Sequence, residues 1–170
     1  QMEFTYFPVE LGQLPAAITY HDLTEGISRI GSARVAAQFL NHPALTLGYR
    51  VEADGVAVVY LVDHEPFSDE LWRADASPGH IDSVLHEGDR RHARFMEGAD
   101  LVIHDAPYTP EESGPKTPWG DSAYEDAVRV AAAAGVRQLA LTHHDPGHDD
   151  RFIADLGRKA RGLALQCGTG

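Results

Sequence analysis

The sequence predicts an α/β fold in which a mixed β-sheet is flanked by helices. Two patterns indicate this class. The first third of the chain consists of short β-branched or aromatic runs separated by Gly- and Pro-bearing turns. From about residue 101 onward, strand-like and helix-like segments alternate, as they do in layers with parallel strands. With 170 residues, 43% of them hydrophobic, the chain fits one domain, which we expect over residues 1–166 before a short tail at 167–170.

The first part of the chain is predicted to be built from strands. The candidate runs are residues 4–7, 18–21, 27–30, 33–40, 45–53 and 56–62. The last two flank Asp54-Gly55, a strong hairpin signal, so we expect them to pair antiparallel. Residues 56–62 are apolar throughout, which is typical of a central strand covered on both faces. Pro43 cannot donate to a strand ladder, so His42 is expected at a strand end.

The second part is predicted to alternate between helices and strands. After a loop at 67–89, the pattern favours a helix at 89–98, a strand at 101–105, a loop at 106–120, a helix at 122–134, a strand at 138–142 and a helix at 149–161. The helix at 122–134 carries the clearest signals. Ser122 and Glu125 have the spacing of a capping box, and Gly135 is expected to end this helix.

Charge and cysteine content narrow the possible functions. The 26 acidic and 14 basic residues leave a formal net charge of -12, which repels a phosphate backbone and argues against generic nucleic-acid binding. The single cysteine, Cys167, cannot form an intramolecular disulfide, so a reducing compartment suits the chain. No run approaches the roughly 18 apolar residues of a membrane span, and no basic-then-apolar leader opens the chain. These features predict a cytoplasmic protein without a membrane partner.

Histidines and carboxylates cluster at three predicted strand ends. The segments are Asn41-His42-Pro43, Asp63-His64-Glu65 and His143-His144-Asp145. The predicted hairpin brings the first two to the same open end. Imidazole and carboxylate together suit Zn²⁺, and also Mn²⁺ or Fe²⁺ when oxygen ligands predominate. Spacing alone leaves other roles open, because His42 could cap a strand end and Asp63 could serve a turn or a helix N-cap.

In this order, the three segments resemble the second half of the metallo-β-lactamase superfamily. Gly48-Tyr49-Arg50 and Leu141-Thr142 belong to the same pattern, which runs from about residue 1 to 163. The branch it is most similar to contains transfer-RNA 3′-processing endonucleases and cyclic phosphodiesterases. The resemblance implies the C-terminal half of an αββα sandwich and a dinuclear site, most simply of zinc. His42 would then bind one metal, His143 the other, and Asp63 would bridge both, so that a metal-bound hydroxide attacks a phosphodiester or a related ester.

The chain departs from the family pattern in two respects. The His-x-His-x-Asp-His motif, which supplies most ligands of the first metal, is absent from these residues. Asp121 stands where relatives often have a histidine that contacts the scissile phosphate, and an aspartate there would repel that phosphate. We keep Asp121 beside Asp63 as a candidate catalytic residue.

Other polar residues are expected to support the ligands or the fold. His64, His144 and Asp105 are expected beside the ligands, although His64 could be exposed and Asp105 could instead open the loop at Pro107. His143 and His144 compete for the ligand role, and His143 is preferred. His21, His80, His86, His92 and His104 show no partner pattern and are interpreted as structural or solvated.

A lone half of a sandwich would expose the face that normally packs on its twin. We therefore expect self-association, with a homodimer that rebuilds the four layers. The leading functional hypothesis is a metal-dependent hydrolase acting on a small molecule or a phosphodiester. The alternative is a truncated, catalytically silent fragment that persists as an oligomerising or binding module. A third hypothesis is a protein that binds one ion without turnover.

Overall fold

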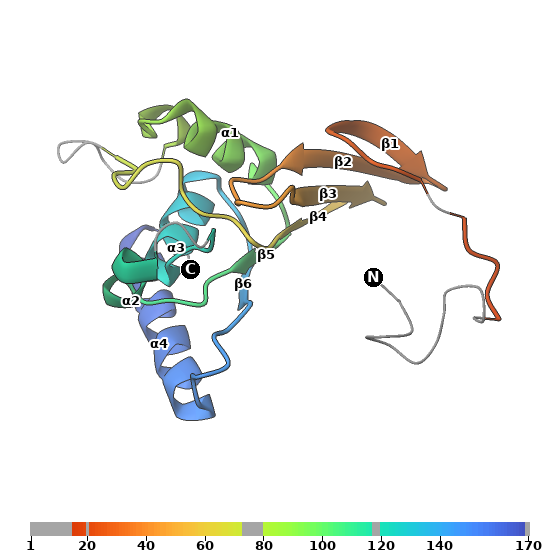
Figure 1. Cartoon of the computed structure of the whole chain (residues 1–170). Coiled ribbons are helices and arrows are strands. Elements are labelled where there is room, and N and C mark those ends of the chain that lie inside the picture. Colours follow the sequence, from red (N-terminus) through yellow and green to blue (C-terminus); the bar gives the residue numbers. More distant parts are fainter. Residues whose placement is uncertain (1–14, 20, 73–79, 117–119, 169–170) are drawn as a thin grey trace.

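The computed structural model describes residues 15–19, 21–72, 80–116 and 120–168 and has the predicted α/β class. In chain order its strands are β1 (Gly26–Ile30), β2 (Ala33–Phe39), β3 (Leu47–Ala53), β4 (Val56–Leu61), β5 (Leu101–Asp105) and β6 (Leu139–Thr142). Its helices are η2 (Ile81–Ser83), α1 (Glu87–Met96), α2 (Pro110–Lys116), α3 (Tyr124–Ala133) and α4 (Asp150–Gln166). The helices gather on one side of the sheet, and β1 to β4 extend away from them (Figure 1).

The strands form one mixed sheet, as predicted. Its order is β1-β2-β3-β4-β5-β6 across six strands. β1 to β4 pair antiparallel, whereas β4, β5 and β6 pair parallel, because helices return the chain between them. At the β3–β4 turn, Asp54 and Gly55 have φ angles of 52° and 78°. Two positive φ angles are what a type I′ hairpin turn requires, so the predicted hairpin is confirmed.

One face of the sheet is covered by α1, α3 and α4. Its core contains Val59, Leu61 and Val102 from the sheet, each 0% exposed, and Met96 and Val130 from the helices. The side chain of Arg50 on β3 donates hydrogen bonds to the carbonyl oxygens of Phe95 and Glu97. Those carbonyls belong to the last turn of α1 and the residue after it, where helical partners run out. The sheet thereby anchors the end of this helix.

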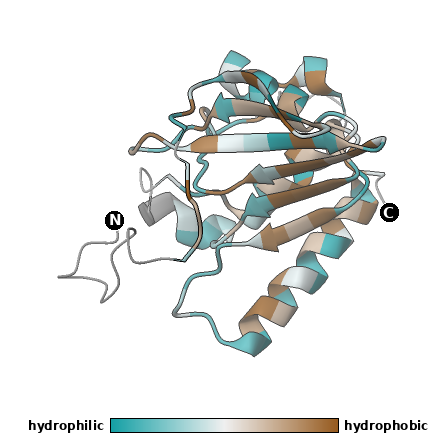
Figure 2. Ribbon diagram, turned by 90° about the vertical axis from the view of Figure 1, so that its right-hand side faces the viewer, coloured by the Kyte–Doolittle hydropathy of each residue, from teal (hydrophilic) through white to brown (hydrophobic). Residues whose placement is uncertain are grey.

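The opposite face of the sheet is mostly apolar and has no helix on it among the described residues. The strand register places on it Gly26, Ser28, Ile30, Ala33, Val35, Ala37, Phe39, Leu47, Tyr49, Val51, Ala53, Val56, Val58, Tyr60, Leu101, Ile103, Asp105, Ala140 and Thr142. We call these residues the open face. Figure 2 looks onto it, with the helices behind the sheet. Val56, Tyr60 and Ile30 are 50%, 45% and 70% exposed, so the prediction that residues 56–62 are covered on both faces is wrong for the single chain.

Several local predictions need correction. The strand expected at 4–7 lies outside the described residues, and Ile18 and His21 are not in a strand. The stretch 106–120, expected to be a loop, contains α2. Its start has a recognisable signal, because Pro110 occupies the first helical position and Glu112 accepts from the backbone N–H of Thr109 at 2.9 Å.

The helix after this loop begins later than predicted. Ala123 is the N-cap of α3 and makes no side-chain cap bond. The hydroxyl of Ser122 instead donates to the carbonyl oxygen of His64 at 2.6 Å, so the predicted capping box does not form. Gly135 has a φ of 63° directly after the C-cap, which agrees with the predicted end of the helix.

The last helix starts where the sequence predicts. The carboxylate of Asp149 accepts from the N–H of Phe152 at 2.8 Å and caps α4, which continues to Gln166 instead of ending at 161. Just before it, the ring of His148 stacks on Phe152, and its Nε2 lies 2.9 Å from an oxygen of Glu112 on α2. None of the described helices is long and apolar enough to cross a membrane.

Candidate metal centre

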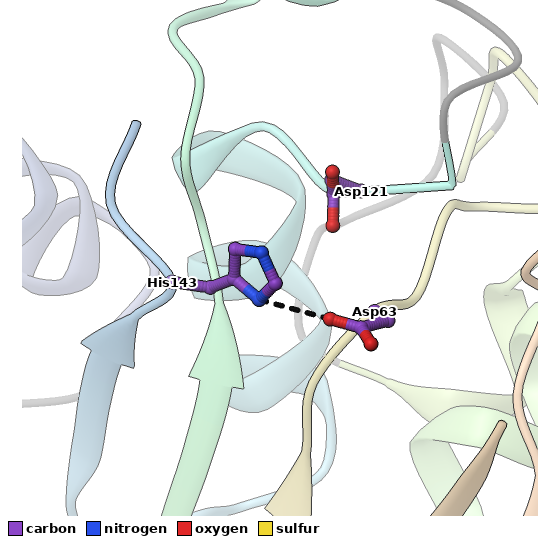
Figure 3. Close-up of side chains that lie close together, drawn as sticks. All are labelled: Asp63, Asp121 and His143. Atoms are coloured by element: carbon purple, nitrogen blue, oxygen red, sulfur yellow. Dashed lines mark ion pairs between the residues drawn. The ribbon is translucent and has the colours of Figure 1, made fainter. Parts of the chain in front are cut away.

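Two strand ends and one loop bring three ligand-type side chains together. Asp63 follows β4, His143 follows β6, and Asp121 lies in the loop before α3. Because β4, β5 and β6 are parallel, their carboxyl ends meet at one edge of the sheet. One potential ligand atom from each of the three side chains lies within 4.8 Å of the others. Figure 3 shows them pointing toward one another.

The backbone around these residues is in a conformation that side chains other than glycine rarely adopt. Asp63 has a φ of 62° and His143 a φ of 59°. Among described residues, only the turn residue Asp54 is another non-glycine with positive φ. Non-glycine residues in this region cost on the order of 1–3 kcal/mol each and cluster at functional sites. Both strand-end residues are therefore held by the fold in positions that local preference disfavours.

The electrostatics of the cluster favour a cation. Nδ1 of His143 lies 2.9 Å from Oδ1 of Asp63 (Figure 3). That oxygen is buried and has no aligned hydrogen bond from any described residue. Burial and the nearby carboxylates of Asp105 and Asp63 raise the pKa of Asp121, although His143 and His42 act in the opposite direction. A positive charge between the three groups would relieve this repulsion.

The donor set fits a divalent transition metal. One imidazole nitrogen and two carboxylate oxygens are ligands that Zn²⁺, Mn²⁺ and Fe²⁺ accept. Side chains around the cluster are 33% exposed at Asp63 and 47% exposed at His143, so an ion and a substrate can reach it. The sequence interpretation placed Asp121 against the substrate, but the structure places it among the potential ligands.

His42, predicted as a ligand, lies beside this cluster instead of within it. Its Nδ1 is 3.1 Å from the N–H and 3.2 Å from the carbonyl oxygen of Ala44, and 3.2 Å from Oγ1 of Thr46. The rest of the ring packs against Gly120. A Cβ atom at that glycine would lie 2.3 Å from Cδ2 of His42 and 3.0 Å from its Nε2. Because Gly120 has no side chain, the ring of His42 can lie against the backbone directly before Asp121.

Hydrogen bonds tie the His42 loop to the Asp63 loop. The side-chain amide of Asn41 donates to the carbonyl oxygen of Glu65 at 2.9 Å, and the N–H of Glu65 donates back to the carbonyl oxygen of Asn41. The carboxylate of Glu65 in turn accepts from the N–H of Gly120 at 3.1 Å. The loops at 41–43, 63–66 and 120–122 are thus bound to one another, although they are far apart in the sequence.

Asp105 bonds to the loop that carries Asp121, and its role beside the ligands stays a prediction. It ends β5, is 0% exposed, and its Oδ2 accepts from the N–H of Ser122 at 2.8 Å. Its Oδ1 lies 3.1 Å from Nδ1 of His104. The bond from the N–H of Ser122 positions the backbone immediately after Asp121. His144, also expected beside the ligands, lines a groove between α3 and α4.

Behind the cluster lie three buried histidines. His64, His92 and His104 are 3%, 2% and 1% exposed. Burial and the charge of His104 lower the pKa values of His64 and His92 well below the usual histidine value. Burial acts in the same direction at His104, but the hydrogen bond and charge of Asp105 outweigh it and raise the pKa of that residue. Among the three, His104 therefore binds a proton most readily.

The sequence contained a signal for these histidines that spacing between ligands does not capture. His92 lies on the same face of α1 as Asp89, Ala93 and Met96, all of them buried. His104 and Val102 lie two positions apart on the same, covered side of β5. A histidine on the apolar side of a helix or strand is buried and needs a partner. His80 and His21 are exposed, as the solvated interpretation requires, and His86 caps α1 by accepting from the N–H of Gly88.

Comparison with known proteins gives a consistent family. A sequence model described as "Beta-lactamase superfamily domain" matches residues 8–144. Ribonuclease Z of Lactococcus lactis subsp. lactis is 27% identical over 180 residues, covering 88% of this chain and 58% of that protein. Ribonuclease Z of Kineococcus radiotolerans is 28% identical over 84% of this chain and 51% of its own length. The chain spans about half the length of these curated relatives.

Solved structures show the same fold. The metallo-beta-lactamase fold protein YhfI from Bacillus subtilis superposes with a TM-score of 0.57 at 19% identity, covering 81% of this chain and 46% of that one. The short form of human tRNase Z superposes with a TM-score of 0.50 at 21% identity, covering 70% of this chain and 38% of that one. At these identities the likeness concerns the fold alone.

Proposed function

The chain belongs to the beta-lactamase superfamily, and we propose from this premise that it is a metal-dependent hydrolase of phosphodiesters or related esters. The observation that carries the proposal is the convergence of Asp63, Asp121 and His143 at the edge of the sheet. Two of the three are held at positive φ, which costs stability and is retained where function uses the geometry.

We propose zinc as the metal, with manganese or iron as alternatives. Asp63, His143 and Asp121 would supply ligands, and His42 would join them through Nε2, which is the ring nitrogen on the side facing Gly120. When bound, such an ion acts as a Lewis acid and supplies a nucleophile at neutral pH. The protein's own contribution is to hold the carboxylates of Asp63 and Asp121 and the imidazole of His143 close enough to bind one ion.

The substrate class follows from the site and from the relatives. The relatives are named Ribonuclease Z, which keeps RNA phosphodiesters within the candidate class. The net charge of -12 argues against a broad, non-specific grip on nucleic acid. We therefore propose that a small phosphodiester, or one defined bond of a larger substrate, is recognised at the metal.

We also propose that two copies associate through the open face. That face is mostly apolar, with Ser28 and Thr142 as uncharged polar residues, and its strand positions carry no charged residue except the buried Asp105 at its edge. Two chains of net charge -12 can therefore meet there without placing like charges in contact. Size-exclusion chromatography with light scattering tests this proposal, and a monomer at micromolar concentration would contradict it.

Metal content and hydrolysis of bis-p-nitrophenyl phosphate test the function. The variants are Asp63→Asn, His143→Ala and His42→Ala, and the control is His80→Ala, which removes an exposed histidine outside the site. We expect the wild type and the control to bind metal and hydrolyse the ester. The first two variants should lose more than about 100-fold in metal affinity, beyond the loss typical of residues that only orient ligands.

The outcomes separate the three hypotheses. Metal binding with activity, both lost in the site variants, supports the hydrolase. Metal binding without activity supports a protein that binds an ion without turnover. A folded wild type that neither binds metal nor hydrolyses the ester would overturn the proposal and favour the silent module.

A further inference from the structure

The three buried histidines form a contiguous group, with His92 stacked on His64 and edge-on to His104, that runs from α1 and β5 to the loops of the site. The rings of His64 and His92 are parallel, with centroids 3.6 Å apart and an interplanar angle of 5°. Nε2 of His92 lies 2.9 Å from Nε2 of His104. His104 is held in turn by Asp105, since its Nδ1 lies 2.8 Å from the carbonyl oxygen of that residue.

His64 is the point at which this stack meets the site. Its Nδ1 accepts from the backbone N–H of Asn41 at 3.2 Å, directly before His42. Its carbonyl oxygen accepts from the hydroxyl of Ser122 at 2.6 Å, directly after Asp121. Its own backbone continues from Asp63. One residue therefore joins the three loops that carry these candidate ligands.

The bond to Asn41 depends on the plane of the His64 ring. A rotation of that ring would carry Nδ1 away from the Asn41 N–H. The parallel ring of His92 lies against one face of His64, and Phe67 approaches it edge-on with centroids 6.1 Å apart. The bond between His92 and His104 fixes the ring of His92 itself. An alanine at position 92 would leave that face of His64 without a neighbour of this kind.

We propose that His92 is a positioning residue: by stacking on His64 it holds the loops of His42, Asp63 and Asp121 at the mutual distance that the metal requires. This inference rests on the proposed function for its metal part. His92 is not one of the candidate ligands, so its effect passes through His64.

Three variants test the role of His92. His92→Ala removes the stacked ring, and His92→Phe restores a flat ring without the bond to His104. Met96→Ala is the matched control, because Met96 is 0% exposed on the same face of α1 but packs in the apolar core. The control should lower the unfolding temperature without affecting the site.

Two readouts separate positioning from general stability. In the metal-free chain, amide hydrogen exchange at Asn41 reports the contact of its loop with His64, because its N–H donates to Nδ1 of that ring. With Co²⁺ as the probe metal, the visible absorption spectrum and the affinity report the ligand geometry. His92→Ala should speed exchange at Asn41 by about tenfold and weaken Co²⁺ binding by about 10- to 100-fold, as loss of an outer partner does. His92→Phe should restore most of both.

Other results would overturn the inference. It fails if His92→Ala matches the wild type in exchange and spectrum, or if Met96→Ala changes both as strongly. If His92→Ala does not fold, His92→Phe is compared with His92→Gln, which keeps a polar group but no ring; a native-like Gln variant would then refute the stack. A wild type that binds no Co²⁺ refutes the proposed function, whereas the exchange at Asn41 still decides whether His92 holds the loops.

Discussion

Both faces of the sheet carry large apolar residues, yet only one of them is packed against helices. On the helix-covered face, Val59 and Leu61 of β4 are 0% exposed, whereas their neighbours Val56 and Tyr60 on the open face are 50% and 45% exposed. Apolar sequence therefore marks surfaces that can be covered, but it does not say what covers them. The covered face also holds the polar histidine stack, so burial and apolar character do not coincide on either side.

The candidate metal site lies at the carboxyl edge of the sheet, where the covered and the open face meet. Asp63 and His143 extend from strands whose covered side is packed against helices, and the histidine stack behind them is part of that packing. We expect changes on the covered face to alter stability, and changes on the open face to alter association.

The largest effect is expected from Leu61→Ala on the covered face. Leu61 is fully buried and packs tightly against Gly48, since a Cβ atom added at Gly48 would collide with its side chain. Gly48 has no side chain that could move into the space left by truncating Leu61. The variant should lose about 2–5 kcal/mol of unfolding free energy. Urea unfolding measures this loss. Leu45→Ala is the control, since Leu45 is 92% exposed and its truncation should change stability by less than about 0.5 kcal/mol.

Asp126→Asn should raise the free energy of unfolding by an amount that depends on pH. Burial raises the pKa of Asp126 to about 6, with Arg129 opposing and Glu125 adding to the shift. The folded chain therefore keeps this proton to a higher pH than the unfolded chain does. Stability contributed by the proton is present below about pH 4, falls between about pH 4 and 6, and is absent above that.

The expected gain at pH 7 is about 1–3 kcal/mol, because each pKa unit corresponds to about 1.4 kcal/mol. It should nearly vanish at pH 4. Unfolding free energies at both pH values check the prediction. Asp150→Asn is the matched control, since Asp150 also lies in the first turn of a helix but is exposed. Equal gains at both pH values, or a loss at pH 7, would refute the role assigned to burial.

The smallest effect on protomer stability is expected on the open face. Tyr60→Lys should change the unfolding free energy of the protomer by about 1 kcal/mol or less, because the side chain is already 45% exposed. It should nevertheless convert the proposed dimer to a monomer, since it would place a charge inside an apolar contact. Light scattering measures the mass. Leu45→Lys, which alters an exposed leucine away from the sheet, should leave association unchanged.

Local patterns predicted much of the fold and part of the site. The Asp54-Gly55 hairpin, the apolar side of α3 and the cap at Asp149 depend on residues close in sequence, and the structure contains all three. The strand ends at Asp63 and His143 were also predicted, and the structure brings them to 2.9 Å. The ligand role of His42 stays a prediction.

Long-range contacts decided the remainder. Ser122 had the local signal of a helix cap, but a carbonyl oxygen 58 positions earlier in the chain provided a stronger partner. Asp121 lies near Asp63 and His143, and His92 and His104 are bonded neighbours, because parallel strands and packed helices bring distant segments together. By itself the sequence determined turns, caps and the periodicity of apolar residues, which depend on neighbours along the chain. Only the tertiary structure decided which face is covered and which polar groups meet, because those free energies depend on partners that the chain must first fold to reach.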